Sequence, residues 1–158
     1  KGRSLGERHA MRFSLMHMTR AFAAGIVFTT AGCAGLETAP AGKPLYDRLG
    51  GHSAITAMVD QFIAHVANDT RINGRFATTD FQKLKGALAD QLCVVTGGPC
   101  AYVGRDMRMA HKGMKITEEE FAVFVGNMGY ALERVKVTGR TREELMQLLE
   151  DMKKDIVD

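Results

Sequence analysis

The chain has 158 residues, of which 46% are hydrophobic, which is the length of one domain with a buried core. Its formal net charge of +3 comes from the first 33 residues, which hold five basic residues and one acidic residue. The remaining 16 basic and 17 acidic residues give a net charge of −1, which argues against a nucleic-acid-binding surface.

The first 33 residues have the pattern of an export signal. Arg12 and Arg20 provide a basic start, an apolar run follows over 21–28, and small residues lead to Cys33. The run is too short to span a bilayer, which needs roughly 20 apolar residues in a helix. The segment resembles a bacterial lipoprotein signal, in which the cysteine after Ala-Gly is lipidated, although Thr30 departs from the leucine usual in that pattern.

We therefore expect residues 1–33 to be a signal and Cys33 a lipidation site. Residues 34–43, with a proline and glycines, would form a flexible linker that tethers the domain to the cell envelope on the periplasmic side. Contact with the membrane would then be made only through the lipid. The alternative is a disordered N-terminal extension on a cytoplasmic protein.

Residues 44–158 show helical patterns and none of the alternation of a half-buried strand. A short helical piece over 44–49 comes first, and apolar residues spaced three and four apart predict helices over 52–68 and 79–96. Two Thr-x-x-Glu patterns predict capping boxes for the last two helices: Thr117 with Glu120, and Thr141 with Glu144. The fold class is therefore all-α, as one domain.

A single histidine, His111, lies in the polar segment 102–117, between a glycine-rich turn and a capped helix. This placement suits a lone axial metal ligand better than a catalytic base with partners. Isolated histidines are nevertheless more often surface residues or satisfied core residues, so the spacing alone does not establish ligation.

Several stretches together carry a family resemblance. They are LYDRLGG (45–51), Phe76, LKG (84–86), GGP (97–99), Tyr102, Gly104 and MAHKGMKIT (109–117). Their order and spacing resemble group I truncated haemoglobins over essentially all of residues 44–158. The resemblance implies a two-over-two helical sandwich around a non-covalent haem b, with His111 as the proximal iron ligand. The absence of a CxxCH motif agrees with non-covalent attachment.

The resemblance also implies further contacts with the haem. Phe76 would press on the haem face, and Phe62 would lie near it on the helix of 52–68. Lys85 and Tyr102 match positions that contact haem propionates, with an ordinary solvated lysine as the lesser alternative for Lys85. The carbonyl of Met107, four residues before His111, is the expected acceptor for the second imidazole nitrogen.

The distal side departs from the family pattern. Ile63 and Leu88 stand where many members carry a tyrosine and a glutamine that hydrogen-bond the ligand. With Leu84 they would form an aliphatic wall, from which dioxygen should leave faster, with carbon monoxide or nitric oxide relatively favoured. Gln91 interrupts this apolar face. It is either a substitute distal donor or, more in keeping with buried amides generally, a structural amide bonded to backbone.

Two further cysteines suit an exported protein. Cys93 is expected on the outward face of its helix, and the turn at 97–99 could return Cys100 to it as a disulfide. The alternative is two free thiols in a cytoplasmic protein. His52 and His65 are interpreted as structural, with sixth-position ligation of the iron as the lesser alternative.

Three function classes follow from the resemblance. We favour reversible binding of oxygen, carbon monoxide or nitric oxide over catalysis. Nitric oxide dioxygenation needs a stable dioxygen complex, against which the aliphatic wall argues. It also needs a reductase, and the sequence does not identify one. Electron transfer is the third class, and a haem-free helical interaction domain is the remaining alternative. The oligomeric state does not follow from the sequence.

Overall fold

The computed structural model describes residues 42–158; the expected signal, Cys33 and most of the linker lie outside the described residues. Its elements in chain order are α1 (Leu45–Leu49), α2 (Gly51–Asn68), the 3-10 turn η1 (Asn73–Phe76), α3 (Phe81–Val95), α4 (Met107–His111), α5 (Glu118–Arg134), α6 (Gly139–Asp151) and the 3-10 turn η2 (Lys153–Asp155). The expected all-α class is confirmed, since the only β-type pairing within 42–158 is an isolated bridge between Ile116 and Val157. No helix in this range is long and apolar enough to cross a membrane.

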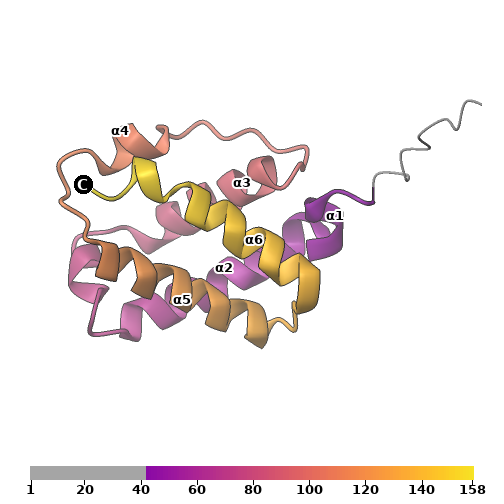
Figure 1. The fold of residues 1–158 in the computed structure, drawn as a ribbon, viewed down its shortest axis with the longest axis horizontal. Coiled ribbons are helices and arrows are strands. Elements are labelled where there is room, and N and C mark those ends of the chain that lie inside the picture. Colours follow the sequence, from indigo (N-terminus) through magenta and orange to yellow (C-terminus); the bar gives the residue numbers. More distant parts are fainter. Residues whose placement is uncertain (1–41) are drawn as a thin grey trace, which may run out of the picture. The chain divides into compact units, whose positions relative to one another are not determined.

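The helices form the expected two-over-two arrangement, in which α2 is central. It packs against both α3 and α5, and α5 in turn packs against α6 (Figure 1). The reason is the three- and four-residue spacing of its apolar side chains, which buries one complete face. Phe62 is fully buried on this face, and its ring meets that of Phe124 edge-on, with 4.7 Å between centroids. Burying such a side chain contributes about 1.5–3 kcal/mol, so this face stabilises the whole arrangement.

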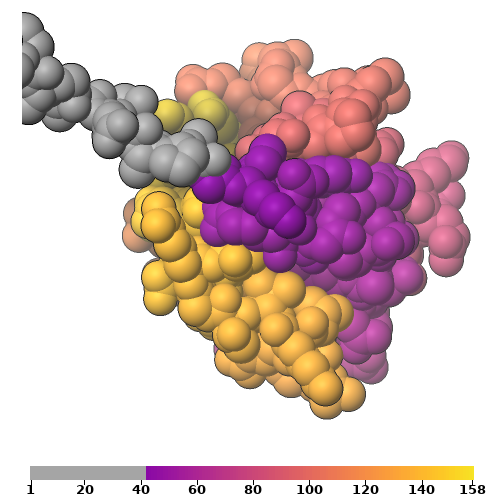
Figure 2. Space-filling view, turned by 90° about the vertical axis from the view of Figure 1, so that its right-hand side faces the viewer, coloured from indigo at the N-terminus to yellow at the C-terminus, as the bar shows by residue number. Residues whose placement is uncertain are grey.

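The short helix α1 joins the ends of three other helices. Its Tyr46 N–H donates to the carbonyl of Thr96 at the end of α3 (2.9 Å), and Arg48 forms an ion pair with Glu144 of α6. In Figure 2, α1 and the start of α2 (indigo to purple) lie beside the C-terminal helices (orange to yellow), in agreement with the contact between α1 and α6.

The capping box predicted for Thr141 and Glu144 is wrong. Helix α6 begins three residues earlier than this box requires, at Gly139, and its N-cap is Thr138, whose side chain makes no capping hydrogen bond. Thr141 and Glu144 instead lie within the helix, where both accept hydrogen bonds from Arg48. The box predicted for Thr117 and Glu120 is confirmed, with both reciprocal hydrogen bonds present.

Asp69, the residue that ends α2, secures the turn toward η1. Its carboxylate accepts hydrogen bonds from the side chains of Arg71 (2.7 and 2.8 Å) and of the buried Asn127 of α5 (3.0 Å). These donors favour the ionised form, and chiefly the hydrogen bonds from Arg71 hold the pKa of Asp69 well below its ordinary value of 3.8.

Asp69→Asn should therefore destabilise the protein at pH 7, and the loss should shrink in acid. A carboxylate whose pKa is lowered on folding stabilises fully above its unfolded pKa, and this contribution disappears as the pH falls from about 3.8 toward the folded pKa. Urea unfolding of both proteins at pH 7 and pH 3 measures the difference. Asp151→Asn, at an exposed carboxylate of α6, is the control. A difference that stays constant between the two pH values would contradict the assignment.

Candidate functional site

A cavity of about 540 Å³ lies among the helices and receives side chains from most of them. The contributions of α3, α5 and α6 to its lining are almost entirely apolar. They are Leu84, Ala87, Leu88, Gln91 and Leu92 from α3, Glu120, Phe121, Phe124, Val125 and Met128 from α5, and Leu149 and Met152 from α6. The polar groups of the remaining lining belong mainly to Arg75, Thr79, Tyr102, Arg105 and His111. Cofactor sites are typically cavities of roughly 300–1,000 Å³ with a few placed polar groups, and this cavity has both properties.

His111 lies at the end of α4 and lines this cavity. Its Nδ1 is 2.8 Å from the carbonyl oxygen of Met107, one helical turn earlier, as the four-residue spacing predicts. A carbonyl can only accept, so Nδ1 carries the proton and donates. In a neutral imidazole with this hydrogen bond, the other ring nitrogen, Nε2, carries the lone pair. This is the tautomer in which a histidine binds a metal ion.

The helix that carries His111 has only five residues, too few to be stable alone. Other parts of the chain hold it. The Asp106 carboxylate accepts from the N–H of Met109 (2.8 Å) at its start, and Arg108 forms an ion pair with Asp155 of η2. After the helix, the N–H of Lys115 donates to the Asp158 carboxylate (2.7 Å). The position of His111 therefore depends on contacts from the far end of the sequence.

Arg75 fixes the segment between α4 and α5 at the edge of the cavity. Its guanidinium donates to both Glu120 carboxylate oxygens (2.7 and 2.8 Å) and to the carbonyls of Met114 (2.8 Å) and Lys115 (3.1 Å). Mainly through the hydrogen bonds of Arg75, the pKa of Glu120 is lowered from its ordinary value. Glu120 thus stays ionised as a fixed partner of Arg75.

The structure brings together most of the residues singled out from the sequence. Phe76, Leu84, Leu88, Gln91, Tyr102 and His111 all line the cavity. Three others do not. Ile63 and Phe62 are buried in the core, where Phe62 supports the lining residue Phe124 from behind. Lys85 lies outside the lining, and its Nζ is 2.7 Å from the Asp60 carboxylate.

Gln91 reaches across to α4. Its amide nitrogen is 3.0 Å from the thioether sulfur of Met107 and 4.0 Å from that of Met152. The expected backbone partner is therefore replaced by a thioether, which is a weak acceptor. Through Met107, Gln91 contacts the same residue whose carbonyl orients His111.

The structure contains a disulfide between Cys93 and Cys100. The expectation that Cys93 faces outward is wrong, since its side chain is fully buried. The chain after α3 folds back over it, and a Cβ at Gly98 would lie only 2.6 Å from its sulfur and 2.4 Å from the Tyr46 ring. The disulfide thus ties the segment that carries Tyr102 to the end of α3.

Sequence reasoning missed Arg105. This exposed residue also lines the cavity and makes no ion pair among residues 42–158. The backbone around it is fixed by the Tyr102 hydroxyl, which donates to the carbonyl of Arg105 (2.8 Å). Its position in the sequence, between the two predicted haem contacts Tyr102 and His111, could have marked it as a residue of the same site.

Comparison with known proteins identifies the family. The family model described as bacterial-like globin matches residues 44–158. A group 1 truncated haemoglobin of Mycolicibacterium paratuberculosis is 33% identical over 102 residues, which are 65% of this chain and 75% of that protein. Another, from Tetrahymena pyriformis, is 32% identical over 115 residues, which are 73% of this chain and 95% of that protein.

Solved structures agree with the sequence comparisons. The crystal structure of the truncated haemoglobin from Tetrahymena pyriformis in its Fe(III) form superposes with a TM-score of 0.70 at 31% identity, covering 73% of this chain and 98% of that one. The chain therefore belongs to the bacterial-like globin family, among the truncated haemoglobins, and its cofactor is haem.

Proposed function

We propose that this globin binds oxygen, carbon monoxide and nitric oxide reversibly, at a non-covalent haem b whose distal pocket is apolar. The observation that carries the proposal is a single cavity lined by His111 from α4 and by leucines from α3. When bound, the haem would supply the iron that takes the gas. The protein supplies the His111 imidazole, oriented by the Met107 carbonyl, and an aliphatic surface that excludes water.

The polar edge of the cavity suits the acidic side chains of haem. Arg105 and Tyr102 lie in one segment at this edge, and Arg105 is the cation there without an ion-pair partner among the described residues. We therefore assign the propionate contacts to Arg105 and Tyr102. Lys85 would have to leave Asp60 to take part.

The first experiment loads the protein with haem and records ferrous spectra with and without each gas. We expect a five-coordinate ferrous iron that binds carbon monoxide. His111→Gly should lose haem to a competing apoglobin at least about tenfold faster, because the protein would no longer supply an iron ligand, and added imidazole should restore the ferrous spectrum.

Two further variants in the same haem-transfer experiment test the edge of the cavity. Arg105→Ala should release haem about threefold faster, the effect of an exposed ion pair, while Lys85→Ala serves as the control that leaves the rate unchanged. A six-coordinate ferrous spectrum without added ligand would overturn the open-site proposal and favour electron transfer. The lining thioether of Met152 would then be a candidate for the second ligand, because His52 and His65 do not line the cavity and Met107 shares the short helix α4 with His111.

The apolar lining of α3 predicts fast release of dioxygen. Leu88→Gln should slow dioxygen dissociation about tenfold, because a hydrogen bond to a charged acceptor contributes about 1.5–3 kcal/mol and 1.4 kcal/mol corresponds to a factor of ten. Gln91→Leu is the matched reverse change. It should leave the rate within about twofold, because the Gln91 amide already contacts Met107. Stopped-flow measurement of the dioxygen dissociation rate tests both expectations. A large acceleration in Gln91→Leu would instead show that Gln91 is a distal donor.

Nitric oxide dioxygenation is the less supported alternative. The reaction requires a long-lived dioxygen complex, and the leucine side chains of the α3 lining offer no hydrogen bond to hold one. Slow dioxygen dissociation from the unmodified protein would revive this alternative.

We also propose that the globin is attached to the cell envelope through a lipid on Cys33. The sequence pattern around Cys33 supports export, and the Cys93–Cys100 disulfide is of a kind that persists in oxidising compartments. Expressed with its leader in a bacterium, the protein should incorporate radiolabelled palmitate and fractionate with membranes. Cys33→Ser should lose the label, and label retained in that variant would refute lipidation at this residue.

A further inference from the structure

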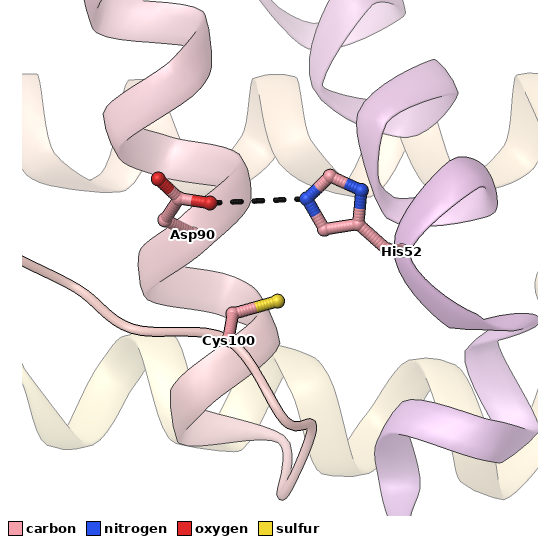
Figure 3. Close-up of side chains that lie close together, drawn as sticks. All are labelled: His52, Asp90 and Cys100. Atoms are coloured by element: carbon pink, nitrogen blue, oxygen red, sulfur yellow. Dashed lines mark ion pairs between the residues drawn. The ribbon is translucent and has the colours of Figure 1, made fainter.

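A second cluster of metal-binding side chains lies outside the haem cavity. It joins His52 at the start of α2, Asp90 of α3 and Cys100 of the segment after α3 (Figure 3). His52 Nε2 lies 3.8 Å from an Asp90 carboxylate oxygen, and these atoms and the Cys100 sulfur are all within 4.8 Å of one another. The sulfur of Cys93 is bonded to that of Cys100, so it is a fourth potential ligand at the same point.

The local structure holds these side chains together and leaves His52 and Asp90 open to solvent, while Cys93 is buried. Asp90 and Cys93 are three residues apart on α3, so they share a face of that helix. The Tyr46 hydroxyl accepts from the N–H of His52 (3.0 Å) and fixes the start of α2 beside them. The side chains of His52 and Asp90 are 51% and 44% exposed, so an ion from solution can reach them.

The ligand types and spacing suit zinc. Zn²⁺ is bound tetrahedrally by imidazole nitrogen, thiolate sulfur and carboxylate oxygen at roughly 2.0–2.3 Å, which separates neighbouring ligand atoms by roughly 3.3–3.8 Å. The 3.8 Å between His52 and Asp90 is a little longer than the roughly 3.4 Å that a nitrogen and an oxygen ligand need, so a small side-chain movement would bring them to this distance. A disulfide sulfur is a poor ligand, because the thiolate is the form that binds metal. In the oxidised protein the cluster therefore lacks its sulfur ligands.

We propose that reduction of the Cys93–Cys100 disulfide converts this cluster into a zinc site, ligated by His52 Nε2, the Asp90 carboxylate and the two thiolates. A dithiol reductant breaks the S–S bond, supplies two electrons and two protons, and is itself oxidised to a disulfide. Zinc then replaces the two thiol protons, which pass to solvent. The two sulfurs would then separate to roughly 3.8 Å, chiefly by movement of Cys100, whose neighbours Pro99 and Ala101 are exposed, because Cys93 is buried on α3.

The oxidised and zinc-bound forms exclude each other but connect the same elements. In both, Cys100 is joined to α3, and the segment that follows it carries Tyr102 and Arg105 to the edge of the haem cavity. The zinc form adds the start of α2 to this connection through His52. A reduced protein would thus keep the segment in place when zinc is available.

The test uses the full, haem-loaded chain with Cys33→Ser, so that only two cysteines remain. The protein is reduced with a phosphine, which does not compete for zinc as a dithiol does, and titrated with zinc against a chromophoric chelator. We expect one tightly bound zinc per chain after reduction and about 100-fold weaker binding before it. Cobalt in place of zinc should give a thiolate-to-cobalt charge-transfer band and the visible bands of a tetrahedral ion.

Four variants assign the ligands. His52→Ala and Asp90→Ala should each weaken zinc binding at least about tenfold. His65→Ala and Asp60→Ala change the same residue types outside the cluster and should leave the affinity unchanged. The proposal fails if reduced protein binds zinc no more tightly than oxidised protein. It also fails if zinc binds the reduced protein equally well in both His52→Ala and Asp90→Ala, since the thiols would then act alone.

Discussion

The candidate site depends on the position of the His111 imidazole, which is carried by α4, a helix too short to be stable without contacts from other segments. The hydrogen bond from His111 to the Met107 carbonyl fixes the ring, but α4 supplies only five residues of backbone support. The remaining support comes from Arg75 before α3 and from Asp155 and Asp158 near the other end of the sequence. Most of these contacts are exposed and individually weak, so the position of the His111 imidazole depends on their sum.

The lining of the cavity is almost entirely apolar on the helices α3, α5 and α6 and polar at its edge. Leucines of α3 with phenylalanines and methionines of α5 and α6 make a surface that favours small uncharged molecules. Arginines and a tyrosine occur where the cavity meets solvent, which suits a cofactor with an apolar ring and acidic side chains. Arg75 is already paired with Glu120, whereas Arg105 has no ion-pair partner among residues 42–158, so the two arginines serve different purposes.

Periodicity and capping predicted the main helices because both are local properties. The stripe of apolar residues in α2 and the Thr117 box of α5 need no knowledge of distant segments. The predictions that were wrong depended on tertiary contacts. Thr141 and Glu144 match the capping pattern, but both side chains accept hydrogen bonds from Arg48 of α1 instead. Cys93 is buried because the chain beyond Gly98 folds back over a helix face that appears exposed when the helix is considered alone.

In the cavity, too, the predictions that failed were those that depended on tertiary contacts. The sequence placed His111, Leu84 and Leu88 in one pocket through family spacing, and the cavity contains all three. It could not place Lys85, because the choice between an acidic cofactor group and Asp60 depends on which carboxylate α2 presents to α3. Nor could it identify the partner of Gln91, since methionine sulfur carries no pattern that marks it as an acceptor.

The position of α1 would have a mechanical consequence under the proposed attachment through Cys33. Tension applied at Pro44 enters α1 and passes through Tyr46 to the end of α3 and through Arg48 to α6. No residue of α1 lines the haem cavity, and the disulfide lies where the first of these force paths meets α3. Under the proposed attachment, tension on the N-terminal segment would therefore reach the helix ends beside the disulfide before it reached His111.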